Sequence, residues 1–134
     1  MVLQNKVLLI GVDTTKLSGT RVTEFDSASI RFEAEESLKS LINEGYDAKW
    51  HFLDLSSDTL EALQLDLSNN NYDCVMVGAG IRRRPETLFL FETIVNMIHF
   101  SSPDTKICFN ADVHDTIQAI KRTLKFSKYE SNTI

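Results

Sequence analysis

Cysteine, proline and glycine are all scarce in this chain of 134 residues, which has two cysteines, two prolines and five glycines. Cys74 and Cys108 are too few for a disulfide framework and are not spaced like metal ligands, so we expect both to be small core residues. No apolar run approaches the roughly 20 residues that a membrane helix needs, and the first residues do not form a signal-peptide pattern. The sequence therefore favours a cytoplasmic protein that is neither membrane-spanning nor low in complexity.

Positive charge is also limited. The chain has 14 Lys and Arg residues against 19 Asp and Glu residues, which gives a net charge of −5. Basic side chains gather at residues 82–84 and 121–128, but the expected fold puts these segments at opposite rims of the sheet. No nucleic-acid partner and no membrane partner are therefore expected.

Apolar segments alternate with amphipathic ones along the chain. The expected strands cover residues 7–12, 48–55, 74–77 and 106–110. The expected helices cover residues 27–43, 57–68, 86–100 and 112–126. This alternation predicts an α/β fold with a four-stranded parallel sheet in the order 2-1-3-4, a flavodoxin-like three-layer α/β/α sandwich. We expect one domain over residues 1–126 and a frayed tail over residues 127–134.

Local signals mark the ends of the helices. Asp26 or Ser27 is expected to cap the first helix, and Gly45 is expected to end it. Asp112 and Asp115 have the spacing of a capping box at the last helix. The apolar face of the first helix is expected to bury Ile30, Ala34, Leu38, Leu41 and Ile42.

In an open parallel sheet a ligand binds at the carboxyl edge, where the strand order reverses. For the order 2-1-3-4 this place lies between the first and third strands, next to the loops at residues 13–26 and 78–85. We predict an anion site there, formed by Asp13, Gly78, Gly80, Arg82 and Asn110. The glycines allow close approach of the backbone and the arginine supplies charge. Alternatively, the glycines only serve the turn and the arginines are solvated or paired with acids.

Known cofactor patterns are absent or incomplete. Residues 14–20 only partly match a flavin phosphate loop, and neither a P-loop nor a dinucleotide fingerprint is present. Asp13 and Asp54, at the ends of adjacent strands, could bind a metal or share a proton, but such residues more often cap the next turn. We therefore predict no cofactor and no metal site, and we identify no nucleophile or general base.

The expected helix over residues 86–100 has an unusual outer face. Phe89 and Phe100 lie on the same side as Glu92 and Asn96, away from the core half of the helix. Exposed aromatic residues beside polar ones can mark an interface, so this helix is a candidate for a protein contact or a homodimer. The alternative is that Phe100 closes over the end of the helix and Phe89 covers the edge of the core.

The chain resembles a family of small single-domain flavodoxin-like α/β proteins of unknown function that carry the pattern GAGIR…LFE…N…FN. The resemblance is carried by residues 72–82, 90–92 and 107–110, together with Asn96. The likeness extends loosely to most of the chain. Arg83 and Arg84 depart from it, because the family tends to have apolar residues or proline there. The resemblance implies that one constellation contains Gly78, Gly80, Arg82, Glu92, Asn96 and Asn110.

Two functions follow from these patterns. The first is a non-catalytic protein-interaction module that uses the helix over residues 86–100, which the lack of an identifiable nucleophile favours. The alternative is a protein, either a binder or an enzyme, that takes a small anionic or phosphorylated ligand, held by Arg82 and the backbone amides of residues 78–80. In the alternative, Arg82 is expected to point into the crevice rather than back towards Glu92.

Overall fold

The computed structural model describes residues 5–13, 24–54 and 56–125, with side chains from residue 28 onward in the first helix. Its four strands are β1 (Lys6–Val12), β2 (Asp47–Leu53), β3 (Cys74–Val77) and β4 (Lys106–Phe109). Its main helices are α1 (Glu24–Asn43), α2 (Ser57–Asn69), α4 (Leu88–Ser101) and α5 (Thr116–Lys125). All strand pairs are parallel and the order is β2-β1-β3-β4, so the predicted topology is confirmed.

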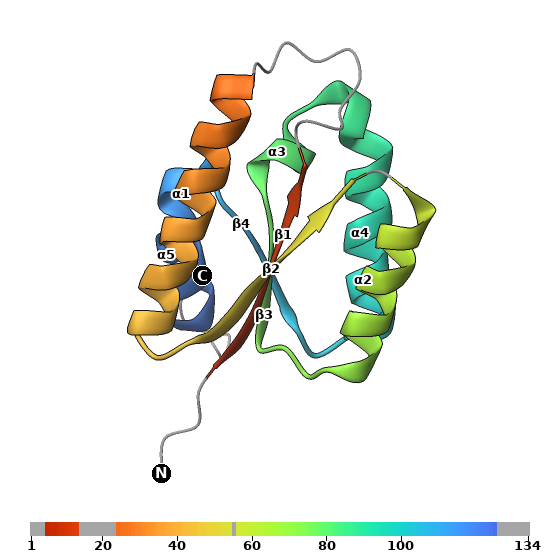
Figure 1. Ribbon diagram of the computed structural model, residues 1–134. Helices are drawn as coiled ribbons and strands as arrows, with labels where there is room; N and C mark the ends of the chain where they lie inside the picture. The colour runs from red at the N-terminus through yellow and green to blue at the C-terminus, as the bar shows by residue number, and fades with distance from the viewer. Residues whose placement is uncertain (1–4, 14–23, 55, 126–134) are drawn as a thin grey trace, which may run out of the picture.

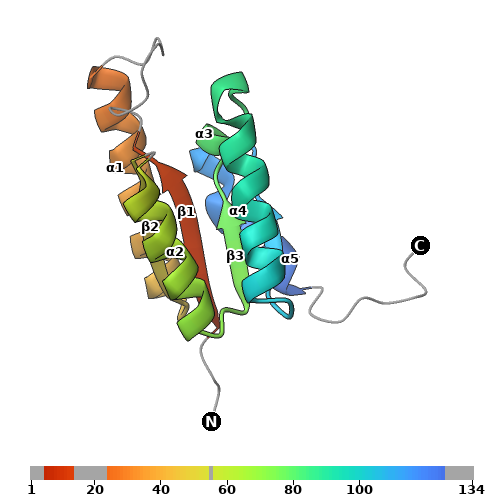
Figure 2. The same ribbon diagram turned by 90° about the vertical axis from the view of Figure 1, so that its right-hand side faces the viewer.

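The sheet lies between two helical layers (Figure 1). Helices α1 and α5 cover one face, and α2 and α4 lie together over the other (Figure 2). Successive residues of a strand point to opposite faces, so β1 divides its side chains between two cores. Leu8 and Ile10 pack under α2 and α4, whereas Val7 and Leu9 pack under α1 and α5.

Several local predictions are confirmed. Gly45 has a φ of 97° and ends α1 in the left-handed conformation that favours glycine. The capping box at Asp112 and Asp115 is present in both directions, ahead of the 3-10 turn η3 (Val113–Asp115). Both cysteines are buried and free. No helix in the described ranges combines the length and apolar character needed to cross a membrane.

Some boundaries differ from the sequence prediction. Helix α1 begins at Glu24, so Asp26 and Ser27 lie inside the helix rather than at its cap. Strand β2 ends at Leu53, and β4 ends one residue earlier than expected, at Phe109. The predicted loop at residues 14–23 and the predicted tail at residues 127–134 lie outside the described residues.

The segment between β3 and α4 differs most from the structure predicted from the sequence. The expected helix over residues 86–100 is preceded by a short helix, α3 (Ala79–Arg82), and begins with the 3-10 turn η2 (Pro85–Thr87). Proline occupies the first turn as predicted. Helix α3 forms because Ile81 is drawn into the core, and the buried Thr87 hydroxyl donates a hydrogen bond to the Ile81 carbonyl. Four residues carry too little periodicity for a helix prediction.

Two apolar residues expected in the core, Ile30 and Ile42, are exposed, and so is Leu88. Ile30 is near the start of α1, whose first turns rise past the carboxyl edge of the sheet (Figure 1). Ile42 and Leu88 are in terminal turns, Ile42 next to the end of α1 and Leu88 at the start of α4. Helical periodicity gives the direction of a side chain but not whether a neighbouring element reaches it.

Candidate functional site

Four residues form a row along the carboxyl edge of the sheet, on the face covered by α1 and α5. Strand pairing places Phe52 beside Gly11. Gly78 and Asn110 follow directly after the paired residues Val77 and Phe109. We call Phe52, Gly11, Gly78 and Asn110 the carboxyl-edge row. Its two central members have no side chain, and a cavity of about 530 Å³ opens above them.

The cavity lies at the place where the strand order reverses, between β1 and β3, and we call it the switch-point cavity. Its position matches the sequence prediction. The lining residues come from α1, β1, β2, the turn after β3 and the loop before α5. They are Gly11, Val12, Ile30, Ala34, Trp50, Phe52, Gly78, Ala79, Gly80, Arg83, Arg84, Asn110, Asp112, Val113 and His114.

One wall of the switch-point cavity is aromatic. The rings of Trp50 and Phe52 stack with centroids 5.0 Å apart and planes at 15°. The indole Nε1 donates a hydrogen bond of 2.9 Å to the Ala34 carbonyl, which fixes the ring against α1. The guanidinium carbon of Arg31 lies 4.1 Å from the Phe52 ring centroid, a cation–π contact. The sequence reasoning assigned both rings only to a strand and did not place them at a site.

The glycines let this wall and the backbone come close together. A Cβ atom on Gly11 would lie 3.0 Å from the Phe52 ring and 3.2 Å from the Trp50 ring. A Cβ atom on Gly78 would lie 3.0 Å from the backbone oxygen of Ile10. Both positions are therefore too crowded for a larger residue unless a neighbour moves.

Asn110 lines the switch-point cavity and also connects two helices through its side-chain hydrogen bonds. The residue is buried, with 3% of its surface exposed. Its Oδ1 accepts a hydrogen bond of 2.8 Å from the amide of Ala79, and its Nδ2 donates one of 3.2 Å to the hydroxyl of Thr116. The carboxamide thus fastens the start of α3 to the start of α5, and it occupies an amide that the sequence reasoning offered to a ligand.

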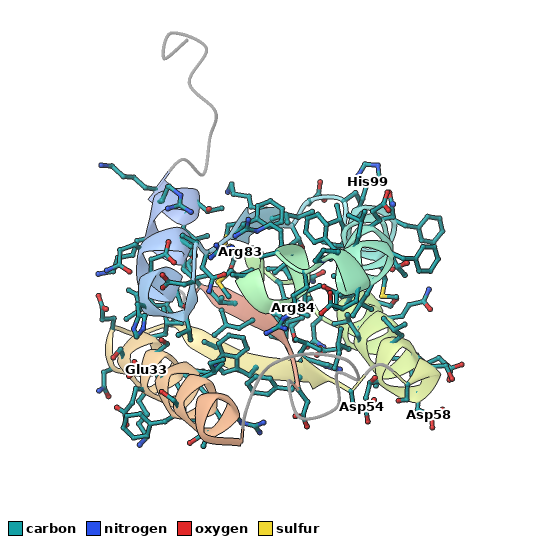
Figure 3. The ribbon with its side chains drawn as sticks, turned by 90° about the horizontal axis from the view of Figure 1, so that it is seen from above. Glu33, Asp54, Asp58, Arg83, Arg84 and His99 are labelled. Carbon is teal, nitrogen blue, oxygen red and sulfur yellow. The ribbon has the colours of Figure 1, made fainter. Side chains whose placement is uncertain are left out.

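The rim of the switch-point cavity is polar and largely cationic. Arg83 and Arg84 lie over the middle of the molecule when it is seen from above the carboxyl edge (Figure 3). The Arg84 guanidinium is 3.9 Å from the Glu86 carboxylate, a loose pair. Nδ1 of His114 lies 3.6 Å from the carboxylate of Glu33 on α1. Arg83 and Arg84 can therefore meet an anionic group at this rim, which they share with Asp112.

The five residues predicted to bind an anion are only partly brought together. Gly78, Gly80 and Asn110 line the switch-point cavity. Asp13 follows β1, is half-buried, and donates its amide hydrogen bond to the Leu53 carbonyl over 2.7 Å. The structure places Arg82 elsewhere: its guanidinium donates to the Asn110 carbonyl on the β4 side of the turn and does not line the cavity.

The four residues predicted to form an interface all lie on the outer side of α4. Phe89 and Phe100 are 81% and 83% exposed, so the alternative in which these rings cover the core is wrong. Glu92 and Asn96 are exposed between them, and the Asn96 side chain donates to the Glu92 carbonyl over 2.9 Å. No ion pair joins Glu92 to Arg82 among the described residues. The constellation implied by the resemblance is thus divided between two surfaces.

Asp54 behaves as the turn residue that the sequence favoured. Its Oδ1 accepts hydrogen bonds of 2.9 Å from the amide of Ser56 and from the hydroxyl of Thr59. Hydrogen bonds from Ser56 and Thr59 hold the pKa of Asp54 at about 2. In Figure 3 Asp54 and Asp58 lie at the rim beside α2, away from Arg83 and Arg84. This carboxylate serves the start of α2 rather than the candidate site.

Within the described ranges, no three His, Cys, Asp or Glu side chains are gathered as metal ligands. Searches against family models, curated protein sequences and solved structures found no match to this chain. The resemblance carried by the segments around Gly78 and Arg82 therefore stays a prediction. The chemistry of the site has to be argued from its own geometry.

Proposed function

We propose that this protein binds a small ligand that combines a flat ring with an anionic group, in the switch-point cavity. The observation that carries this proposal is a cavity of about 530 Å³ with a stacked aromatic wall on one side and two arginines on its rim. Small-molecule sites typically have volumes of about 300–1,000 Å³, mostly apolar walls and a few polar groups. The cavity matches this description at the edge where α/β sheets bind ligands.

Each part of the proposed ligand has a counterpart in the cavity. A ring can lie against Trp50 and Phe52, and the bare backbone at Gly78 lets it approach the sheet closely. Arg83 and Arg84 can reach a phosphate or carboxylate at the opening, since a guanidinium matches the geometry of an oxyanion. The pair between Arg84 and Glu86 is partly exposed and 3.9 Å long, so an anion can compete with it.

Trp50 is the single tryptophan of the chain and lines the cavity, so its fluorescence reports on the proposed site. Adenosine monophosphate and adenosine form a matched pair of probes with and without the anionic group. We expect the monophosphate to change the Trp50 emission and to bind at least about tenfold more tightly than adenosine. Replacing Arg83 and Arg84 by Gln should remove this difference, whereas Lys39→Gln on the exposed side of α1 should not. Equal affinities for both probes would remove the anionic part of the proposal, and no response to either would contradict ring binding.

The outer face of α4 supports a second candidate function, a protein contact with another copy of this chain. Phe89 and Phe100 are exposed at the two ends of the face, and Thr93 and Asn96 lie between them. The spacing from Phe89 to Thr93 equals that from Asn96 to Phe100. In an antiparallel pair of α4 helices, each Phe89 would meet Phe100 of the other copy, and each Thr93 would meet Asn96. Such self-complementarity is what a twofold interface requires.

Sedimentation analysis at several concentrations tests this second candidate. We expect a dimer that Phe89→Glu and Phe100→Glu each convert to a monomer. Phe32→Glu is the matched control, because Phe32 is an exposed phenylalanine on α1. A monomer at every concentration, or a dimer that survives both α4 substitutions, would contradict the homodimer.

A further inference from the structure

Three arginines converge on the carboxyl end of the edge strand β4. Arg122 of α5 donates a hydrogen bond of 2.9 Å to the Phe109 carbonyl. Arg82 of α3 donates to the Asn110 carbonyl, and Arg83 donates to the Ala111 carbonyl over 3.1 Å. Three guanidinium groups from two helices and a turn thus bond to three successive carbonyl groups of one strand end.

These arginines border a hollow of about 520 Å³ that is distinct from the switch-point cavity. We call it the arginine hollow. It is lined by Arg82, Arg83, Arg122, Phe109, Ala111 and Asp115, with Asn110 between the two sites. The aromatic wall of the switch-point cavity does not reach it.

The arginine hollow has an excess of positive charge. Within the described ranges, no carboxylate forms an ion pair with Arg82, Arg83 or Arg122, although ion pairs engage Arg31, Lys49, Arg84 and Lys121 elsewhere. Asp115 is the one acid in the lining. Burial opposes its ionisation, but hydrogen bonds from the amides of Asp112 and Ala111, together with the positive charge of Arg122, outweigh that effect and lower the pKa of Asp115. Three positive groups therefore face one negative group, in a chain whose net charge is −5.

Most of the hydrogen-bonding capacity of these arginines is not used by the fold. A guanidinium has five N–H donors, and the three carbonyl bonds use one donor from each arginine. Nε of Arg82 is buried and has no partner. Bonds to the strand end alone do not account for three cations at one place, since like charges repel each other and neutral donors could serve the same carbonyls.

We infer that the arginine hollow binds a phosphoryl group. A tetrahedral dianion can accept hydrogen bonds from several guanidinium forks at once and offsets the charge excess, whereas a monocarboxylate offsets only half of it. The phosphoryl group can belong to free phosphate or to the end of a phosphate monoester. Trp50 and Phe52 take no part in this inference, whereas Arg83 borders both the arginine hollow and the switch-point cavity, so the test relies on Arg122, which lines the hollow and not the cavity.

Isothermal titration with inorganic phosphate, against sodium chloride at equal ionic strength, tests the inference. Methyl phosphate in a parallel arm distinguishes the two sources, since tighter binding of the ester identifies a monoester site. We expect Arg122→Gln to raise the Kd for phosphate at least about tenfold, the loss typical of a charge-assisted contact. Lys125→Gln, which removes one charge from the same turn of α5 outside the hollow, should change the Kd less than about twofold.

Two spectroscopic readouts complete the test. Phosphate should shift the Nε–H NMR signals of Arg82 and Arg122 in the unmodified protein, which requires no variant, and should leave that of Arg31 in place. The Trp50 emission should not respond to phosphate, and its response to adenosine monophosphate should persist in Arg122→Gln. Three results would each overturn the inference. The first is no effect of phosphate beyond that of sodium chloride, and the second is an equal rise of the Kd for phosphate in Arg122→Gln and Lys125→Gln. The third is a Trp50 emission that changes along with the phosphate titration.

Discussion

The two faces of the sheet end differently at the carboxyl edge. On the face covered by α2 and α4, every residue that β1 and β3 contribute has a large side chain. The last of these residues, Val12 and Val77, are buried, and Ile81 of α3 packs in the same core. On the face covered by α1 and α5, the last positions are Gly11 of β1 and Gly78 directly after β3, and a cavity opens there. One face is a packed core throughout, and the other becomes a site in its last row.

The difference between the two faces depends on neighbouring residues of the same strand. Adjacent residues of a strand point to opposite faces, so Val12 and Gly11 belong to different faces although they are neighbours in the chain. The stacked rings of Trp50 and Phe52 lie directly against the backbone of Gly11, because a Cβ there would be only 3.0 Å from the Phe52 ring and 3.2 Å from the Trp50 ring. The candidate site therefore forms where glycines occupy the last row of an otherwise regular sheet.

The strongest test of this contrast concerns the packed face. Ile94 of α4 is fully buried there, and Ile94→Ala should lower the free energy of unfolding by about 3 kcal/mol through lost burial and the void left behind. Urea denaturation measures the loss, and Glu92→Ala on the exposed side of the same helix is the control, with an expected change below about 0.5 kcal/mol. The Trp50 response to adenosine monophosphate should be the same in both variants. A weakened response in folded Ile94→Ala protein would show that the two faces are not independent.

Asn110 joins the two faces, and its loss should have the next largest effect. Asn110→Ala leaves the Ala79 amide without its acceptor and the Thr116 hydroxyl without the donated hydrogen bond. We expect a loss of about 2 kcal/mol in the free energy of unfolding, because buried polar groups lose their partners. Thermal melts measure the change against Asn96→Ala, an exposed asparagine whose substitution should be nearly neutral. Equal melting temperatures for the two variants would show that the carboxamide does not hold α3 to α5.

Gly11→Ala fills the last row on the open face and should have a smaller effect. The new Cβ would lie 3.0 Å from the Phe52 ring, which is a side chain and can move. We expect a loss of about 1 kcal/mol from overpacking and a changed Trp50 emission, since Trp50 stacks on the displaced ring. The measurement combines urea denaturation with fluorescence. An unchanged emission spectrum together with full stability would mean that the aromatic wall does not depend on this glycine.

The sequence predicted the sheet well because the apolar residues of a strand indicate directly how deeply that strand is buried. Val7 to Val12 are apolar without interruption, and β1 is central and buried as that pattern indicates. The capping box at Asp112 and Asp115 was also readable, since it depends on residues three positions apart. Features that depend on long-range contacts were not readable. Ile30 has the spacing of a core residue but is 40% exposed and lines the switch-point cavity.

A cavity lies where the candidate site was predicted, but its lining differs from the predicted set of residues. The strand order gave the position between β1 and β3, and Gly78 and Asn110 line the cavity found there. Arg82 was expected in the crevice, but the unforeseen helix α3 turns it towards β4 instead. Trp50 and Phe52 were missed, although a signal existed: strand alternation puts both on the same face as Gly11. Reading alternation across neighbouring strands would have found them.

The smallest effect is expected at Gly80. Substitution there tests whether this glycine is required for lack of space, as Gly78 is, or only lies close to the cavity. A Cβ on Gly80 would be 3.5 Å from a methyl group of Val12, an ordinary contact, and its φ is not in the left-handed region. Gly80 is also inside helix α3, where alanine restricts the unfolded chain without straining the fold. Gly80→Ala should therefore leave the free energy of unfolding unchanged or raise it by up to about 1 kcal/mol. Gly78→Ala, whose Cβ would lie 3.0 Å from the Ile10 carbonyl oxygen, should instead be destabilising. Urea denaturation of the two variants side by side measures the difference, and a loss in Gly80→Ala as large as that in Gly78→Ala would mean that the whole turn, and not its first residue alone, requires glycine.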